Sequence, residues 1–390
     1  MDRAYAVREY RGEQKPQKKT VLSNIISVGA MDYTLFLVVV ILALIGVVMV
    51  FSSSFMRAVG AGHDPYFFLR RQGSFFVIGL IGMIVMANVH YKYLRSLSFF
   101  LYMLSNVLLV LVLIIGITSH GATRWIPMPL IGQFQPSELA KAGVIFFLSF
   151  LISNNKNLLN KWPGFILCCF IAAFSSMLVI LGRNLSTSII IMIVGIGIIF
   201  IASQHIVRFV VAGCAGVGGV LGYLVLSSAS DNFRAARFDA WLDPFAYPTT
   251  FGFQIIQSLY AIASGGMFGL GLGQSRQKTF LPEAHNDIIF SIISEELGFI
   301  GATAVLLLFA ILIWRGINIA MNAPDKFSAL TAMGIIILVS SQVLINVAVV
   351  TNSIPNTGVP LPFISYGGTS LIVAMGLMGV LLNISRCSKE

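Results

Sequence analysis

Apolar positions along this chain form long runs that are separated by short polar stretches. Ten runs approach the length of a transmembrane helix, which takes about 20 apolar residues. They lie near residues 33–53, 73–89, 97–117, 139–152, 165–181, 187–202, 209–227, 288–314, 329–350 and 370–384. The run at 139–152 is short for a span. The pattern predicts an all-α polytopic membrane protein of about ten transmembrane helices, with no soluble domain between them.

Basic residues predict the orientation of these spans. They gather in the tail 1–32 and in alternate loops, at Lys92, Arg95, Lys156, Lys161, Arg208, Arg315, Lys326, Arg386 and Lys389. Because cytoplasmic loops are enriched in Lys and Arg, we expect both termini in the cytoplasm. The chain then divides into a basic cytoplasmic tail (1–32), a ten-span membrane domain (33–384) and a cytoplasmic tail (385–390). The first apolar run starts too late and is too long for a secretory signal peptide, so we expect the tail to be retained.

The connection 228–286 falls outside the membrane on this topology and is far longer than an ordinary loop. Its many aromatic residues are typical of a segment that lies at the lipid–water boundary. Residues 251–264 predict a short amphipathic helix, and the glycines of 265–273 predict a bend. The GLGLG sequence in that bend is a poor nucleotide-binding motif, because no strand precedes it.

Composition supports a membrane protein and excludes other classes. The chain has 390 residues, is 57% hydrophobic and 10% charged, and carries a formal net charge of +10. The basic excess fits membrane lipid headgroups, and no module for nucleic acid is visible. The four cysteines and five histidines lack metal-ligand spacing, so the sequence leaves any metal site unknown.

The segment 281–298 is the most unusual part of the chain, because it carries five ionisable side chains where an apolar run begins. On a helix, Asp287, Ser291, Ser294, Glu295 and Gly298 would share one polar stripe. Acids near membrane depth are costly to keep and mark function by default. Asp287 is either a helix cap or a carboxylate at the mouth of a cavity, and Glu295 either faces the stripe or pairs with a buried base.

Three further segments are polar and irregular. In 123–141, prolines exclude a continuous helix, Arg124 is either an interfacial anchor or a headgroup ligand, and Glu138 and Lys141 predict an ion pair at i, i+3. Arg183 and Asn184 form a short outer turn, where a lone arginine is usually interfacial. Segment 351–369 has three prolines, three glycines and no charge, and predicts a loop that lines a cavity. If these segments converge, they form one extracytoplasmic cavity.

Eight stretches of this chain together resemble the SEDS family (shape, elongation, division and sporulation), which includes FtsW, RodA and SpoVE. They are FSSS at 51–54, GATRWI at 121–126, FQPSELAK at 134–141, NLSTS at 184–188, SGGMFGLGLGQS at 264–275, LPEAHNDIIF at 281–290, EELG at 295–298 and PLPFISYGGTS at 360–370. The basic tail and the VTNSIPNTG stretch are most similar to the FtsW/SpoVE branch. The chain departs from the family pattern at Arg183–Thr187 and at His285–Ile288, and Asn184 carries no charge where a metal or catalytic role would need one.

The resemblance implies a peptidoglycan glycosyltransferase of the bacterial cytoplasmic membrane. Such an enzyme polymerises lipid II at the outer face, with a class B penicillin-binding protein and other division or sporulation membrane proteins as partners. It implies Asp287 as the catalytic residue, a divalent cation (Mg or Mn) as a supporting ion, and no organic cofactor. With the irregular segments it gives these candidate substrate-binding residues: Arg124, Glu138, Lys141, Asn184, Glu283, His285, Ser365 and Gly367.

The expected chemistry is attack of a sugar hydroxyl on an anomeric carbon that carries a diphosphate. One carboxylate serves as the base, and a second acid is unnecessary because diphosphate leaves readily. Asp287 is expected to be that base or to help position a cation, and Arg124 or Lys141 is expected to face the diphosphate. Two alternatives remain open. A lipid II flippase, or another carrier of lipid-linked sugars, would need polar residues through the bilayer. A non-catalytic scaffold would give Asp287 no role.

Overall fold

The computed structural model describes residues 29–119, 122–128, 132–155, 157–209, 211, 239–250, 252–281 and 284–388. Within these ranges, nine helices are long and apolar enough to cross a membrane. They are α2 (Tyr33–Gly60), α3 (Phe67–Asn88), α4 (Tyr91–Ile115), α5 (Pro136–Asn154), α6 (Trp162–Leu181), α7 (Leu185–Ala202), α11 (Ile289–Met321), α12 (Lys326–Val350) and α13 (Gly368–Arg386). The expected span at 209–227 lies almost entirely outside the described residues.

Local sequence explains where several of these helices start. The side chain of Asp32 caps α2, Asn184 caps α7, and Asp325 forms a capping box with Ser328 at the start of α12. Pro136 occupies the first turn of α5, where its missing N–H costs nothing. The run expected at 139–152 therefore extends to 19 residues and is long enough to be a span.

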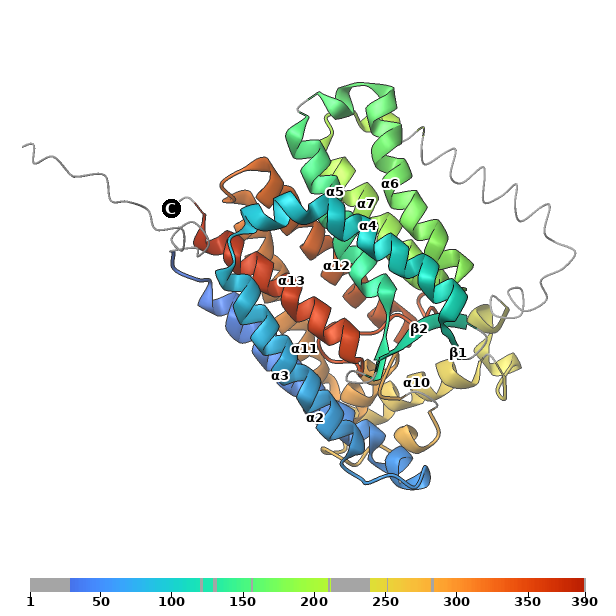
Figure 1. The fold of residues 1–390 in the computed structure, drawn as a ribbon. Coiled ribbons are helices and arrows are strands. Elements are labelled where there is room, and N and C mark those ends of the chain that lie inside the picture. Colours follow the sequence, from blue (N-terminus) through green and yellow to red (C-terminus); the bar gives the residue numbers. More distant parts are fainter. Residues whose placement is uncertain are drawn as a thin grey trace, which may run out of the picture.

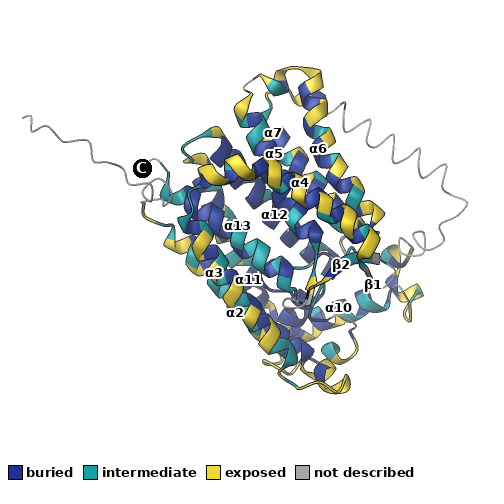
Figure 2. Ribbon diagram, in the orientation of Figure 1, coloured by how far each residue is buried: buried dark blue, intermediate teal, exposed yellow. Residues whose placement is uncertain are grey.

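Helix α5 is the most buried of these helices, followed equally by α12 and α13. In Figure 2 these helices are mainly dark blue and teal. Helix α3 packs along α13, and α4 packs along α5. Helices α6 and α7 lie together on one side, whereas α2 and α11 contact each other on the other side (Figure 1). The outward faces of α2, α3, α4 and α6 expose large apolar side chains, as expected for helices that face lipid.

Polar contacts identify the two ends of the bundle. At one end the Asp32 amide donates to the Ser385 hydroxyl (3.2 Å), and Arg315 forms an ion pair with Asp32 (2.7 Å). The start of α2 and the end of α13 therefore lie together. We call this the inner end, and the opposite end, which carries the irregular segments, the outer end. A cytoplasmic location of the inner end remains a prediction from charge.

The outer end carries the only strands among the described residues. Strands β1 (Ile117–Ser119), β2 (Ala122–Met128) and β3 (Gly132–Phe134) form an antiparallel sheet in the order β1-β2-β3. The prolines of this segment disfavour helix but are tolerated in a short exposed ribbon. The all-α prediction therefore holds for the membrane domain, with this small sheet as an addition. The expected helix at 251–264 forms as α10 (Phe253–Gly265), and the short helical turns η2 (Pro244–Ala246) and η3 (Gln277–Thr279) flank it in the chain.

Helix α11 is kinked at Gly298, which has φ 69° and ψ −171°. The kink opens the helix so that the glycine-rich loop after α10 pairs with it. The amides of Leu270 and Gly271 donate to the carbonyls of Glu295 (2.9 Å) and Glu296 (3.0 Å). A Cβ atom on Gly298 would lie 2.3 Å from the Gly269 nitrogen, so only glycine fits this approach.

Candidate active site at the outer end of the bundle

Asp287 lies in a turn just before α11, which begins at Ile289. The predicted polar stripe is therefore wrong, because 284–288 is not helical. The hydroxyls of Ser291 and Ser294 donate to the carbonyls of Ile288 (2.7 Å) and Phe290 (2.9 Å) within the same segment. The capping interpretation of Asp287 is wrong too, since Ile288 is the N-cap. Asp287 is half-buried at the outer end.

Two residues from the C-terminal third of the chain fix the surroundings of Asp287. The buried Asn346 of α12 donates its Nδ2 to the carbonyl of Asp287 (2.7 Å) and to that of Val359 (2.8 Å). Gly358 has φ +68° and lies so close that a Cβ there would be 3.1 Å from Asp287 Oδ2. The loop 351–367 therefore lies against the carboxylate, as a cavity-lining loop would.

The same loop is bonded to the residues that precede Asp287. Ser365 Oγ accepts from the Leu361 amide (2.7 Å) and donates to the Asn286 carbonyl (2.7 Å). The Tyr366 amide donates to the His285 carbonyl (2.9 Å). The His285 ring is buried and contacts those of Phe68 and Tyr366, with centroids 4.9 and 5.4 Å away. His285 therefore contributes packing at this position.

Burial raises the pKa of the Tyr366 hydroxyl, and Arg71 beside it partly opposes the shift. The hydroxyl therefore remains protonated at neutral pH and can donate a hydrogen bond.

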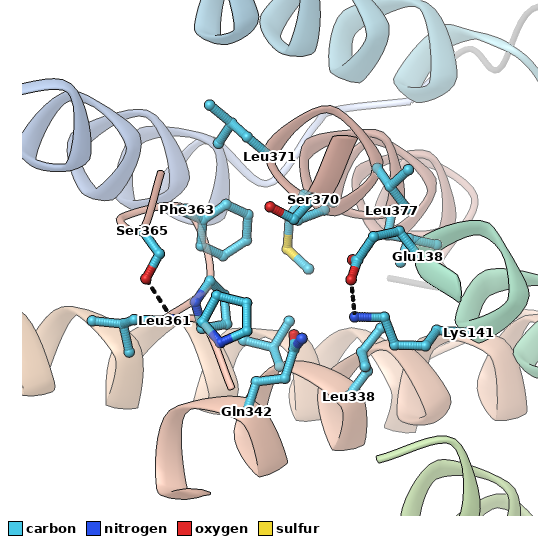
Figure 3. Close-up of a pocket in the computed structure, with 16 residues that line it drawn as sticks. Glu138, Lys141, Leu338, Gln342, Leu361, Phe363, Ser365, Ser370, Leu371 and Leu377 are labelled. Atoms are coloured by element: carbon cyan, nitrogen blue, oxygen red, sulfur yellow. Dashed lines mark hydrogen bonds and ion pairs between the residues drawn. The ribbon is translucent and has the colours of Figure 1, made fainter. Parts of the chain in front are cut away.

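A cavity separates this loop from α5, α12 and α13. Figure 3 places Ser365 at one side of it and Glu138 with Lys141 at the other, with Phe363 and Gln342 between. Lys141 Nζ donates to Glu138 Oε1 at 2.8 Å, and both side chains are buried. The ion pair that the i, i+3 spacing predicts is therefore formed, and it lines the cavity.

A second cavity lies beside the sheet and is lined by both Arg124 and Asn184. Arg124 donates a guanidinium N–H to the Arg183 carbonyl (2.6 Å). The Asn184 side chain accepts from the Thr187 amide (3.3 Å) and so acts as the cap of α7. In this first turn of α7, the Ser186 hydroxyl donates to the Thr357 carbonyl, which joins this region to the loop 351–367.

The loop 351–367 therefore joins the irregular segments. They line two cavities rather than the single one expected from the sequence, and Asp287 is not among the residues that line either cavity. The loop contacts the Asp287 turn, the start of α7 and the cavity of Glu138 and Lys141. Gly367 ends the loop as the N-cap of α13. Glu283 lies outside the described residues.

The expected pairing of Glu295 with a basic side chain is wrong. Glu295 accepts from the Ser275 hydroxyl and from the amides of Arg276 (3.0 Å) and Gln277 (3.4 Å). Its neighbour Glu296 forms the ion pair, with Lys278 (3.4 Å). Both carboxylates contact the loop after α10, which sequence spacing along a single helix does not reveal.

The sequence interpretation also missed Asn346 and Gln72. Gln72 of α3 is buried and donates to the Ser365 carbonyl (3.3 Å). A buried amide in an apolar helix is the signal that identifies such residues, because an amide at that depth needs partners.

The side chains near Asp287 decide how a divalent cation could bind there. Within the described ranges no three His, Cys, Asp or Glu side chains cluster to form a complete protein site. Magnesium often uses only one or two carboxylates and takes its other ligands from phosphates and water. A single carboxylate that meets a diphosphate substrate fits this pattern.

Comparison with known proteins agrees with this architecture. The family model FTSW_RODA_SPOVE, "Cell cycle protein", matches residues 32–390. Stage V sporulation protein E of Bacillus subtilis is 45% identical over 92% of this chain and 98% of its own length. A protein from Geobacter named as a probable peptidoglycan glycosyltransferase FtsW is 39% identical over 91% of this chain and 96% of its own length.

Solved structures share the fold. A chain from a study of "structural coordination of polymerization and crosslinking by a peptidoglycan synthase complex" has a TM-score of 0.77 and 26% identity, and the match covers 92% of this chain and 98% of that one. The rod shape determining protein RodA of Thermus thermophilus has a TM-score of 0.67 and 25% identity, over 93% and 98% of the two chains. The match spans nearly the whole sequence, so this chain belongs to the FtsW/RodA/SpoVE family of multi-pass membrane proteins.

Proposed function

We propose that this chain is a peptidoglycan glycosyltransferase that polymerises lipid II at the outer face of the bacterial cytoplasmic membrane, with Asp287 as its catalytic carboxylate. Family membership supports the reaction class. The position of Asp287 supports its role, because it is half-buried at the outer end beside a loop that its neighbours hold in place. There it can meet a saccharide whose lipid tail remains in the membrane.

Asp287 acts as a general base. Its carboxylate takes the proton of the attacking sugar hydroxyl, the new bond to the anomeric carbon forms, and the bond from that carbon to the diphosphate breaks. The hydrogen bonds of Asn346 and Ser365 fix the backbone on either side of the carboxylate. Because the carboxylate is held in place before the substrate binds, the bound sugar hydroxyl meets it in the orientation that the reaction needs.

Basic residues at the outer end serve the leaving group. Arg124 is half-buried at the outer end and lines a cavity there. Lys141 is bonded to Glu138, so its charge is already compensated. A guanidinium can bind phosphate oxygens through two parallel hydrogen bonds, so Arg124 is the better ligand for the diphosphate, and Lys141 and Glu138 shape the cavity wall. As an alternative to the role of base, Asp287 would help to hold a divalent cation, which would supply charge stabilisation for the diphosphate.

Partners and cellular role follow from the relatives. The similarity to a chain of a peptidoglycan synthase complex supports a class B penicillin-binding protein as the partner. The similarity to a sporulation protein and to FtsW proteins supports a role in sporulation or division, together with other membrane proteins of those processes. We propose that both termini are cytoplasmic, which agrees with the shared inner end of α2 and α13.

The test is polymerisation of labelled lipid II by the purified protein with its partner. Asp287→Asn keeps the side-chain shape but removes the base, and we expect the product to disappear. Asp64→Asn is the matched control, since Asp64 is an exposed outer carboxylate that pairs with Arg70 (3.0 Å). Full activity of Asp287→Asn would refute the assignment. Transbilayer movement of lipid II without polymer formation by the wild-type protein would favour the flippase alternative.

A further inference from the structure

Helix α11 buries two adjacent carboxylates that the proposed mechanism does not use. Glu295 is 0% exposed and Glu296 is 1% exposed. Acids within a membrane helix are costly to keep and mark a function by default. The hydrogen bonds of these two carboxylates indicate what they hold in place.

Glu295 holds the start of η3. Its carboxylate accepts from the Ser275 hydroxyl and from the amides of Arg276 and Gln277 at 3.0 and 3.4 Å. These amides lie at the N-terminal side of a helical turn, where they have no partner within the turn. A carboxylate from another helix thus accepts from the first amides of the turn, and the Ser275 hydroxyl accepts from the Lys278 amide (3.2 Å).

Glu296 fastens the same segment to a second helix. Its oxygens accept from the Ser52 hydroxyl of α2 (2.6 and 2.7 Å) and the Ser275 amide (3.3 Å), and it pairs with Lys278. Lys278 Nζ also donates to the Gly273 carbonyl (2.6 Å). Segment 275–278 is therefore bonded directly to α11 and linked to α2 through Glu296, by charge-assisted hydrogen bonds, which are stronger than neutral ones.

The attachment of segment 275–278 affects Asp287 because the two are close together in the chain. Segment 275–278 is held on α11 at one end, and α11 begins at Ile289 at the other. Asp287 lies in the short connection between them. Tying both ends of a connection reduces the range of positions that its residues sample.

We propose that Glu295 and Glu296 are positioning residues, which hold segment 275–278 against α2 and α11 and thereby restrict where the Asp287 carboxylate can lie. This role rests on the proposed function of Asp287. Displacement of a reacting group by about 1 Å can cost roughly 100-fold in rate. Loss of the Glu295 contacts should therefore reduce turnover and leave binding of the substrate largely intact.

Three variants test this role. Glu295→Ala removes the acceptor, and we expect kcat to fall about 100-fold with KM within about threefold of the wild type. Glu295→Gln restores activity to within about tenfold, because its carbonyl accepts from the amides and its NH2 donates to Ser275. Ser275→Ala removes one donor and gives an intermediate loss in a protein that folds. Ser98→Ala is the control, since this buried hydroxyl bonds only to Leu94 of its own helix (2.7 Å).

Hydrogen exchange by mass spectrometry gives a second readout that does not depend on activity. Peptides that cover 276–287 should exchange faster in Glu295→Ala than in the wild type, while peptides of α12 stay unchanged. Wild-type kcat in Glu295→Ala, a rise in KM that accounts for the whole loss, or no rescue by Glu295→Gln would overturn the positioning role. A wild-type protein that does not polymerise lipid II would overturn the proposed function, whatever the exchange shows.

Discussion

Replacement of Asn346 tests whether the backbone around Asp287 must be held in place. The Asn346 side chain is 1% exposed, and its Nδ2 is the donor to the carbonyls of both Asp287 and Val359. Asn346→Asp keeps the size and shape of the side chain. It replaces the donor by an oxygen that faces two carbonyl oxygens.

The two hydrogen bonds of Asn346 set the free energy that Asn346→Asp should lose. Each lost hydrogen bond costs about 1 kcal/mol, and a buried carbonyl left without a donor costs about 1–3 kcal/mol. Two such carbonyls give a loss of about 2–6 kcal/mol. If all of it falls on the positioning of Asp287, the rate drops about 30- to 25,000-fold, since 1.36 kcal/mol corresponds to tenfold. Asn346→Ala should cost less, because the space it leaves between two carbonyls can admit a water.

The assay is polymerisation of labelled lipid II, expressed per folded molecule, with thermal unfolding measured in the same detergent. Asn383→Asp is the matched control, since Asn383 is equally buried at the inner end and donates to the Ala87 carbonyl (3.0 Å). It should unfold at a lower temperature and keep its rate per folded molecule. The reasoning fails if Asn346→Asp is as active as Asn346→Ala, or if Asn383→Asp loses the same activity.

Two further changes probe other parts of the bundle. Glu138→Gln or Lys141→Met alone should each destabilise by about 3–5 kcal/mol, and the double variant should be closer to the wild type in thermal unfolding, because a lone buried charge is worse than none. Additive losses would contradict this, and a stable but inactive double variant would show that the pair serves the substrate. Burial and Lys92 lower the pKa of His90, whose Nδ1 caps α4 (3.3 Å), so acidification below the unfolded value of 6.5 should reduce stability. His90→Asn keeps a side chain that can cap the helix. Between pH 7.5 and 5.5 its melting temperature should fall less than that of the wild type, and an equal fall in both proteins would exclude His90 as the cause.

The spans could be predicted from the sequence because a membrane leaves the backbone few options. A long apolar run has to form a helix there, and i, i+3 neighbours such as Glu138 and Lys141 then meet within it. The start of α11 could not be predicted. The turn before it depends on Asn346 and Ser365, which lie 59 and 79 residues away from their partners in the chain. The partners of Glu295 come from a loop that local spacing leaves unspecified.

The bond between Ser52 and Glu296 joins residues that are 244 positions apart. At about 5–20 residues per second, the ribosome delivers α11 roughly 12–50 s after Ser52 has been made. During that interval the Ser52 hydroxyl needs another acceptor, and Ser53 and Ser54 show which one is available, since both donate to carbonyls of their own helix. We therefore expect this contact to form by an exchange of partners, late in the insertion of the chain into the membrane. A chain cut before residue 296 would leave α2 inserted but the outer end unassembled.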